Sequence, residues 1–364
     1  MKQIRLTCVV GARPNFIKMS AILEAARLRP RFLIRLIHTG QHFSPEMSQQ
    51  LFDDLEIQEP DTNLGVGAGT PTQQTAEIMK MLEADFLAHR PDAVLVVGDV
   101  NSTMAAALVA VKLDIKVIHV EAGLRSFDRA MPEETNRLVT DVLSDFLFVS
   151  EESGIRNLRA EGVSPEKVFL VGNVMIDTLH RFRPKAEAST ILNQLGVRAG
   201  EYAVVTLHRP SNVDLPEQLT ALIAMLERIA QKVPVILPIH PRTRARLGNY
   251  QPSAALSLVP PLGYLDFMQL TSKARLVLTD SGGIQEETTV LGIPCFTLRD
   301  NTERPSTVEV GSNYLVGADP EEALRQVLEA LENGPKSGRV PDFWDGRAAE
   351  RIFDVLELRL GEGS

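Results

Sequence analysis

The stretch DAVLVVGDVNSTMAAALVAVKLDIKVIHVEA, residues 92–122, predicts the fold class of the chain. It begins with an uninterrupted apolar run and ends with a second β-branched run, and the segment between them has a helical pattern. Two apolar runs joined in this way indicate parallel strands that are buried on both faces of a sheet. We therefore expect a strand–helix–strand unit here.

The same alternation recurs before and after this unit. A second series of apolar runs starts after residues 180–201, a polar stretch broken by proline and glycine that we interpret as an inter-domain region. The pattern predicts an α/β protein with two Rossmann-like, doubly wound domains that face each other across a central cleft. Strands are expected at 4–10, 31–39, 92–99, 116–122, 145–150, 201–208, 233–240, 274–280 and 293–299.

Composition limits the classes of function. A chain of 364 residues exceeds the usual size of one core, so two domains are expected. The net charge of −9 argues against a nucleic-acid partner, although a few placed cations can still hold a small anion. No apolar run is long enough to suggest a membrane span. The only cysteines, Cys8 and Cys295, lie in strand-like runs, which favours buried thiols in a reducing cytoplasm.

Charged and polar segments follow the predicted strands. The carboxyl ends of parallel strands share one edge of a sheet, and ligands bind outside that edge. Turn formation would explain one such segment, but not a series that carries Arg, Lys, His, Asp and Glu at the same structural address. We therefore expect a ligand site there. The segments are GARPNFIK (11–18), TGQH (39–42), GDVNS (98–102), EAGLR (121–125), LHRPSN (207–212), IHPRTR (239–244) and TDSGG (279–283).

The first segment has the features of an anion site. GARPNFIK offers Arg13 and Lys18 beside a helix that starts near Pro14, where free backbone N–H groups are expected. It matches neither the GxGxxG motif of dinucleotide-binding proteins nor a P-loop. Neither a nicotinamide nor another cofactor is therefore expected.

A second anion site is predicted in TDSGGIQEE. Ser281 can cap a helix there, and Gly282 and Gly283 let a pyrophosphate approach the helix N-terminus closely. Glu286 and Glu287 follow one turn later, where the ribose of a sugar nucleotide could lie.

Histidines also follow strands of the second series. Arg209 lies next to His208, and His240 follows the next strand in an HPR motif, so both a structural and a functional role stay open for these residues. The histidines lack a compact spacing with cysteines or carboxylates. No metal site is therefore expected.

Carboxylates gather near the end of the opening stretch. Asp99 and Glu121 each end a predicted strand, and Glu133 and Glu134 open the next predicted helix. Carboxylates that converge beside basic residues suit acid–base chemistry on a sugar. A favourable contact with the helix dipole is the alternative, and it suits Glu134.

The sequence resembles the non-hydrolysing UDP-N-acetylglucosamine 2-epimerases, a family with the two-domain GT-B fold. The resemblance covers nearly the whole chain, and it includes a final helix of the kind that crosses back to the N-terminal domain in GT-B proteins. We expect domains at 1–170 and 171–345, followed by this helix at 346–364. The motifs that carry the resemblance, in family order, are GARPNFIKM, TGQH, GDVNST, HVEAGLRS, PEETNR, VGNVMIDTL, TLHRPSN, PIHPRTR, TDSGGIQEE, GIPCFTLRDNTERP and GSNYLVG.

The resemblance implies an isomerase that interconverts UDP-N-acetylglucosamine (UDP-GlcNAc) and UDP-N-acetylmannosamine (UDP-ManNAc). In that family, UDP is eliminated across C1–C2 to give 2-acetamidoglucal and is then added back with the opposite configuration at C2. The resemblance also implies a cytoplasmic homodimer that uses a UDP-sugar, needs no cofactor and serves the synthesis of cell-surface polysaccharides.

The resemblance also implies roles for individual residues. Acid–base and oxocarbenium-stabilising roles fall on Asp99, Glu121, Glu133 and His208. Phe267 matches part of the uracil pocket. The remaining substrate-binding candidates are Arg13, Lys18, Ser281, Gly282, Gly283, Glu287 and Arg304, and Arg137, Arg209 and His240 are possible additions.

One departure from the family pattern concerns regulation. Some bacterial members bind a second, allosteric UDP-GlcNAc through a polar set of residues. Gln41, Arg209 and His240 match that set, but Phe43 and Ser44 do not supply the rest. We therefore expect weak allosteric activation or none.

Other functions stay open on the same scaffold. Ser211 and Ser306 stand where family members often have an acidic residue. A hydrolysing 2-epimerase would release ManNAc and UDP, and a 2-epimerase of a UDP-diacetamido-uronic acid would need an extra cation near C6. A GT-B glycosyltransferase would need an acceptor cleft. A nucleotide-sugar sensor would not require all four acid–base candidates.

Overall fold

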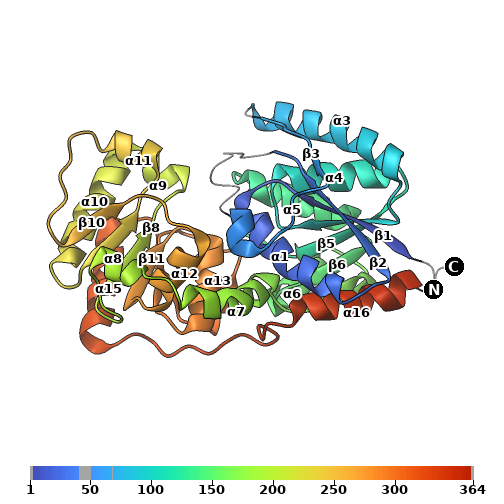
Figure 1. Cartoon of the computed structure of the whole chain (residues 1–364). Coiled ribbons are helices and arrows are strands. Elements are labelled where there is room, and N and C mark those ends of the chain that lie inside the picture. The colour runs from blue at the N-terminus through green and yellow to red at the C-terminus, as the bar shows by residue number, and fades with distance from the viewer. Residues whose placement is uncertain (1–2, 41–50, 68, 362–364) are drawn as a thin grey trace. The chain divides into compact units, whose positions relative to one another are not determined.

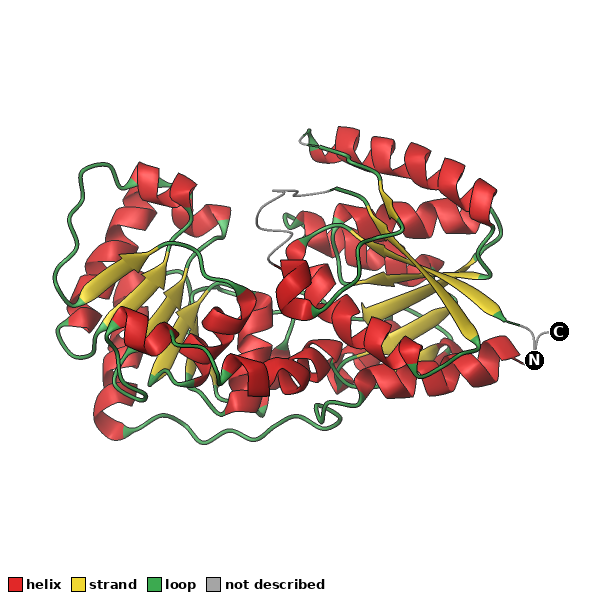
Figure 2. Cartoon of the chain, viewed as in Figure 1, coloured by secondary structure: helices red, strands yellow, loops and turns green. Residues whose placement is uncertain are grey.

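The computed structural model describes residues 3–40, 51–67 and 69–361, which form two compact units (Figure 1). The N-terminal unit comprises Met1–Arg181 together with Asp342–Ser364, and the C-terminal unit comprises Phe182–Pro341. Each unit contains one parallel sheet with helices on both faces (Figure 2).

The sheet of the N-terminal unit has seven strands in the order β3-β2-β1-β4-β5-β6-β7. All five residues of β4 are buried, as expected for a strand that is covered on both faces. The elements of this unit are β1 (Ile4–Val10), α1 (Arg13–Arg27), β2 (Phe32–His38), β3 (Thr62–Asn63), α3 (Pro71–His89), β4 (Ala93–Val97), α4 (Asn101–Lys112), β5 (Lys116–Ala122), α5 (Pro132–Leu143), β6 (Phe146–Val149), α6 (Glu152–Ala160), β7 (Val168–Leu170), most of α7 (Val174–Ala186) and α16 (Ala348–Gly361).

The sheet of the C-terminal unit has six strands in the order β10-β9-β8-β11-β12-β13. A hydrophobic core cluster joins this sheet to its helices and includes Leu226, Val235 and Phe296. The elements are α8 (Ile191–Leu195), β8 (Ala203–Thr206), α9 (Pro210–Val213), α10 (Pro216–Ala230), β9 (Val235–Pro238), α11 (Pro241–Arg246), β10 (Leu256–Val259), α12 (Tyr264–Ser272), β11 (Leu276–Thr279), α13 (Gly282–Leu291), β12 (Cys295–Thr297), α14 (Pro305–Glu309), β13 (Asn313–Leu315) and α15 (Pro320–Asn333).

These two sheets confirm the predicted α/β class and the two doubly wound, Rossmann-like units. Every strand expected from the sequence is present, and the strand order reverses between β1 and β4 and again between β8 and β11. Ligands of doubly wound sheets bind at such switch points, outside the carboxyl ends of the strands. The sequence did not predict β3, β7, β10 and β13, which are short strands toward the edges of the sheets and lack a long apolar run.

The chain passes from the first unit to the second within α7, between Arg181 and Phe182, rather than at the expected 170/171 boundary. The physical reason is packing: the Thr178 hydroxyl donates to the Ile17 carbonyl in the N-terminal unit (2.7 Å), whereas the ring of Phe182 lies 6.4 Å from that of Tyr264 in the C-terminal unit. Much of the polar stretch 180–201 is helical, since it contains the end of α7 and all of α8.

The last helix, α16, belongs to the N-terminal unit and packs on α1 (Figure 1). The ring of Phe353 meets that of Phe32 at 5.0 Å, edge to face, and Asp354 accepts a hydrogen bond of 2.6 Å from Arg29. The N-terminus of α16 is held by Asp177, whose carboxylate accepts the backbone N–H groups of Ala348 (3.1 Å) and Ala349 (2.7 Å).

Candidate active site

The loops at the switch point of the N-terminal sheet are held together by Asn15. Its Oδ1 accepts the backbone N–H groups of Gly11 (3.4 Å) and Ala12 (3.1 Å), and its Nδ2 donates to the carbonyl of Val97 at 2.9 Å. Because Gly11 follows β1 and Val97 ends β4, this side chain ties together the two strands that flank the switch point. Asn15 is part of the GARPNFIK motif, but the presence of an asparagine at this position did not indicate this role.

Lys18 and Glu121 form a buried ion pair at this edge. Lys18 Nζ lies 2.6 Å from Glu121 Oε1, and the two side chains are 5% and 4% exposed. Gly98 makes room for the pair, since a Cβ there would lie 3.1 Å from Lys18 Nζ and its φ of +66° favours glycine. The sequence predicts a phosphate contact for Lys18, whereas in the structure the ammonium group faces the Glu121 carboxylate.

The backbone at Glu121 adopts an unusual conformation. Its φ is +72°, in the left-handed region that residues with a side chain rarely adopt. The register between β5 and β6 shifts at the same place, between Val120 and Ala122, so that Glu121 is bulged out of the ladder. Strain of this kind persists only where the surrounding structure holds it, and it is concentrated at functional sites.

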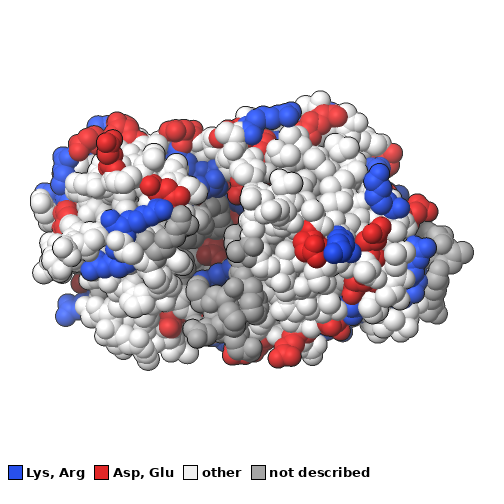
Figure 3. All heavy atoms as spheres, turned by 90° about the horizontal axis from the view of Figure 1, so that it is seen from above, with Lys and Arg blue, Asp and Glu red and all other residues white. Residues whose placement is uncertain are grey.

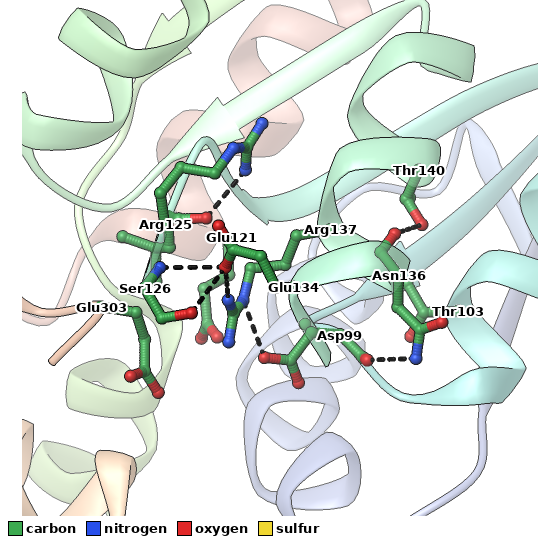
Figure 4. Close-up of polar contacts among 12 residues, drawn as sticks. Asp99, Thr103, Glu121, Arg125, Ser126, Glu134, Asn136, Arg137, Thr140 and Glu303 are labelled. Carbon is green, nitrogen blue, oxygen red and sulfur yellow. Dashed lines mark hydrogen bonds and ion pairs between the residues drawn. The ribbon is translucent and has the colours of Figure 1, made fainter. Parts of the chain in front are cut away.

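Asp99, Arg137 and Glu134 form a chain of charges beside this pair (Figure 4). Arg137 Nε donates to Asp99 Oδ2 at 3.0 Å, and Arg137 Nη1 donates to Glu134 Oε2. The Asp99 carbonyl also accepts a hydrogen bond of 2.8 Å from Asn136 Nδ2. The Asp99 side chain is 23% exposed, whereas that of Arg137 is 3% exposed. The Arg137 guanidinium is therefore buried, whereas the Asp99 carboxylate can contact a ligand.

Glu134 organises the loop after β5. Its carboxylate accepts the backbone N–H groups of Ser126 (2.9 Å) and Phe127 (3.0 Å) as well as the Ser126 hydroxyl (2.9 Å), as Figure 4 shows for Ser126. These contacts give Glu134 a structural role that exceeds a helix-dipole interaction. Glu133, by contrast, is half-buried and makes no hydrogen bond or ion pair with any described residue.

A buried histidine supports the Asp99 loop. His119 Nδ1 lies 2.6 Å from Asp141 Oδ1, and Nε2 lies 2.9 Å from the Gly98 carbonyl oxygen. Burial alone would raise the pKa of Asp141, but His119 and Arg125 hold that pKa below its ordinary value. The two ring nitrogens therefore face a carboxylate oxygen and a carbonyl oxygen. The contact between His119 Nε2 and the Gly98 carbonyl fixes the peptide group immediately before Asp99.

The sequence indicated no role for His119, Asp141 or Arg125. Arg125 Nη2 lies 2.7 Å from Asp141 Oδ2 and 2.6 Å from Glu161 Oε2, which extends the buried network away from Asp99. The signal that could have revealed it is a histidine in the middle of an otherwise apolar, buried strand. Its partner lies 22 residues away, and spacing along the chain does not identify it.

At the switch point of the C-terminal sheet, His208 meets Asp280. His208 Nδ1 lies 2.5 Å from Asp280 Oδ1, and the carboxylate is fully buried while the imidazole is 61% exposed. Asp280 also accepts the backbone N–H of Arg209 at 2.9 Å. The sequence predicted His208 as a site residue, but it identified Asp280 only as the end of a strand.

Helix α13 begins at Gly282, two residues after Asp280 in the sequence. Ser281 occupies the N-cap position as predicted, but its side chain makes no capping hydrogen bond, so it leaves the first-turn N–H groups without that acceptor. Gly282 packs closely against Arg304, because a Cβ there would lie 2.5 Å from Arg304 Nη1. Gly283 follows in the first turn of the helix, and Glu287 is buried one turn further on.

Arg304 is buried between two carboxylates. Its Nε lies 2.8 Å from Glu286 Oε1, and its Nη1 donates to Glu303. Glu286, which the sequence placed where a ribose could lie, is fully buried, and its carboxylate faces Arg304. Glu303 in turn accepts a hydrogen bond of 2.8 Å from Arg299.

The remaining candidates lie at the predicted addresses in the fold. Arg13 is exposed at the first residue of α1, Arg209 is half-buried after β8, and His240 is exposed after β9. Phe267 is half-buried in α12, where it packs against an apolar cluster of the C-terminal unit. Other residues named for an allosteric site, namely Gln41, Phe43 and Ser44, lie outside the described residues.

Surface charge, potential metal ligands and helix length bear on whether the chain could have other kinds of function. Acidic and basic side chains are interspersed on the face seen in Figure 3, and neither sign covers it continuously. Across residues 3–40, 51–67 and 69–361, no group of three or more His, Cys, Asp or Glu side chains could hold a metal ion. None of the described helices combines the length and the apolar character that crossing a bilayer requires.

Two doubly wound parallel sheets, each with charged side chains at its switch point, define a two-domain protein of the GT-B type. The sequence profile of the family described as UDP-N-acetylglucosamine 2-epimerase matches residues 24–357. The chain therefore belongs to the UDP-N-acetylglucosamine 2-epimerase family, as its motifs predicted.

Relatives with known structures or names agree with this membership. The chain is 42% identical to the UDP-N-acetylglucosamine 2-epimerase of Methanocaldococcus jannaschii, over 97% of this chain and 99% of the relative. It superposes on a crystal structure of the UDP-GlcNAc 2-epimerase from that organism, in complex with UDP-GlcNAc and UDP, with a TM-score of 0.89, 40% identity and coverage of 98% and 100%. It is also 40% identical to the UDP-2,3-diacetamido-2,3-dideoxy-D-glucuronate 2-epimerase of Pseudomonas aeruginosa, over 97% and 99% of the two chains.

Proposed function

We propose that this chain interconverts UDP-GlcNAc and UDP-ManNAc by eliminating UDP and adding it back. The observation that carries the proposal is the cluster at the N-terminal switch point: Glu121 on a strained backbone against Lys18, beside Asp99 against Arg137. Family membership supplies the substrate class.

The chemistry accounts for such a cluster. The hydrogen at C2 of the sugar is not next to a carbonyl, so enolisation cannot remove it. Elimination transfers that proton to a base, forms the C1–C2 double bond and releases UDP with the electron pair of the C1–O bond. Re-addition on the glucal returns a proton to the other face of C2 and re-forms the C1–O bond. The transition state carries positive charge near C1 and negative charge on the leaving diphosphate.

Asp99 and Glu121 suit different parts of this reaction. The Asp99 carboxylate is partly exposed and is oriented by Arg137, which suits proton transfer at C2. Glu121 forms a buried pair with Lys18, which suits electrostatic support of positive charge at C1. Glu133 is free of partners among the described residues and is the candidate for proton transfer on the second face.

The C-terminal unit has the features of a UDP site. The first turn of α13 offers backbone N–H groups and the Ser281 hydroxyl to a diphosphate, and Gly282 and Gly283 carry no side chain that would block the approach. Phe267 offers a half-buried ring for uracil, and Glu287 offers a carboxylate for the ribose hydroxyls. His208, Arg209, His240 and Arg304 supply cationic or hydrogen-bonding groups in the same unit.

The setting in the cell follows from the same membership. We propose a cytoplasmic homodimer that needs no cofactor and supplies an amino sugar for cell-surface polysaccharide. The two cysteines, Cys8 and Cys295, are buried and unpaired with each other, which suits a reducing compartment.

A second substrate is favoured by one specific observation. The Pseudomonas aeruginosa relative, whose name specifies a diacetamido-uronate, is as similar to this chain as the UDP-GlcNAc 2-epimerase of Methanococcus maripaludis, at 40% and 39% identity. A uronate differs from GlcNAc by a carboxylate at C6, and its recognition calls for a cation there. Both substrates therefore belong in the first assay.

The deciding experiment is proton NMR of the purified chain with each UDP-sugar in D2O. We expect deuterium at C2 of UDP-GlcNAc, accumulation of UDP-ManNAc and little free sugar. Release of ManNAc with stoichiometric UDP would identify a hydrolysing enzyme instead. Exchange only in the diacetamido-uronate would assign that substrate, and no exchange in either would contradict the proposal.

A further inference from the structure

The pair formed by His208 and Asp280 joins two neighbouring strands. His208 lies just beyond β8 and Asp280 just beyond β11, and these strands pair in parallel with Thr206 opposite Thr279. Their side chains meet at 2.5 Å, between His208 Nδ1 and Asp280 Oδ1. The contact lies at the switch point of the C-terminal sheet, where a ligand of such a sheet binds.

The Asp280 carboxylate is surrounded by donors. It accepts the backbone N–H groups of His208 (3.0 Å) and Arg209 (2.9 Å) and the side-chain amide of Asn212 (3.0 Å). Burial alone would raise its pKa, but the hydrogen bonds from His208, Arg209 and Asn212 hold that pKa below its ordinary value. The carboxylate is therefore ionised at neutral pH.

An ionised carboxylate can only accept hydrogen bonds, so His208 Nδ1 must carry the shared hydrogen. The other ring nitrogen, Nε2, makes no hydrogen bond with any described residue, and the side chain is 61% exposed. The ring is thus oriented from within the protein through one nitrogen, while the other stays available to a ligand. A carboxylate that fixes the tautomer of a histidine has the same logic in hydrolase triads.

We propose that Asp280 is a positioning residue that acts through His208. It keeps the shared hydrogen on His208 Nδ1, so that the ring adopts the Nδ1–H tautomer, and holds Nε2 toward the UDP-sugar. This inference rests on the proposed function for its substrate, but the state of the ring can be measured without any substrate.

The first test is a nitrogen NMR spectrum of the chain labelled with 15N-histidine, recorded where the ring is neutral. We expect the His208 signals of the Nδ1–H tautomer, the minor form of free histidine. Asp280→Asn should shift the ring toward the Nε2–H tautomer. Asn212→Ala is the matched control, because it removes another hydrogen bond from the same carboxylate and leaves the ring contact in place. An Nε2–H tautomer in the unaltered chain would overturn the proposal even if no variant folds.

The second test is a double-mutant cycle on the rate of deuterium exchange at C2 of UDP-GlcNAc. Asp280→Asn and His208→Gln should each lower kcat by about 100-fold or more, as expected when an acid–base or orienting group is lost. If Asp280 acts through His208, the double variant loses no more than His208→Gln alone. Effects that multiply would show that Asp280 acts by itself, and would overturn the positioning role.

The two tests separate this inference from the proposed function. If the unaltered chain exchanges no deuterium into UDP-GlcNAc, the proposed function fails, while the tautomer of His208 still decides the role of Asp280. If exchange proceeds but the tautomer is unchanged in Asp280→Asn, the proposed function stands and the positioning role is wrong.

Discussion

At the scale of single residues, Asp99 is the proposed group whose chemistry can be tested with the least disturbance of the fold. It is partly exposed, and it contributes one ion pair, to Arg137 at 3.0 Å. We expect Asp99→Asn to lower turnover by at least about 100-fold, because an amide cannot accept the C2 proton. UDP affinity should change by less than about tenfold, roughly 1.4 kcal/mol, as measured by calorimetry.

The matched control for that variant lies at the other end of the same strand. Asp92 precedes β4, accepts the backbone N–H of Arg5 at 2.7 Å and has a side chain that is 31% exposed. Asp92→Asn should leave turnover near that of the unaltered chain. Substantial activity in Asp99→Asn would contradict the role proposed for its carboxylate.

Lys18 makes a separate prediction about stability. Lys18→Met leaves the Glu121 carboxylate buried at 4% exposure without its cation, and loss of one partner from a buried pair costs about 3–5 kcal/mol. Urea unfolding should therefore show a large loss of stability in Lys18→Met. Adding Glu121→Gln should restore part of the stability without restoring turnover. Equal stability of Lys18→Met and the unaltered chain would show that the pair is not coupled in solution.

At the scale of elements, the docking of α16 depends on a buried carboxylate. Asp177 accepts two backbone N–H groups at the start of α16, yet burial outweighs these bonds and raises its pKa to about 6 from the ordinary 3.8. Between about pH 4 and 6, Asp177 is therefore protonated to a greater extent in the folded state than in the unfolded state. Over that range, the contribution of this group to stability grows as the pH falls.

The prediction compares the unaltered chain with Asp177→Asn. As the pH falls from 7.5 to 5, the unaltered chain should gain stability relative to Asp177→Asn. The limiting slope of the difference in their free energies of unfolding is about 1.4 kcal/mol per pH unit. The single tryptophan, Trp344, is a local reporter, since it is buried and donates to the Ser150 carbonyl at 2.9 Å near the start of α16. Groups common to both proteins cancel in the comparison. A difference that is independent of pH would contradict the raised pKa of Asp177.

At the scale of the whole molecule, two sheets that share the order of six strands each provide one switch point. Carboxylates are concentrated at the first, and a helix N-terminus with a histidine lies at the second. This division matches the two requirements of the proposed reaction, proton transfer on the sugar and retention of UDP.

Steady-state kinetics test regulation at the same scale. The chain matches the allosteric residue set of some bacterial relatives only in part, so we expect rates that rise hyperbolically with UDP-GlcNAc, with a Hill coefficient of about 1. A clearly sigmoidal curve would contradict this expectation and would indicate a second UDP-GlcNAc site. His240→Ala is the variant that should then restore a hyperbolic curve.

The sequence by itself determined the fold class, the longer strands and the addresses of the charged segments. Burial on both faces of a sheet requires apolar runs, and this pattern is local, so it can be read without a structure. Family motifs also identified Asp99, Glu121 and His208 as candidates. Only the tertiary structure decided which charges meet: Lys18 pairs with Glu121 across 103 residues, and His208 meets Asp280. The physical reason is that such partners are chosen by strand order, which brings distant strand ends to one switch point, and spacing along the chain does not encode that order.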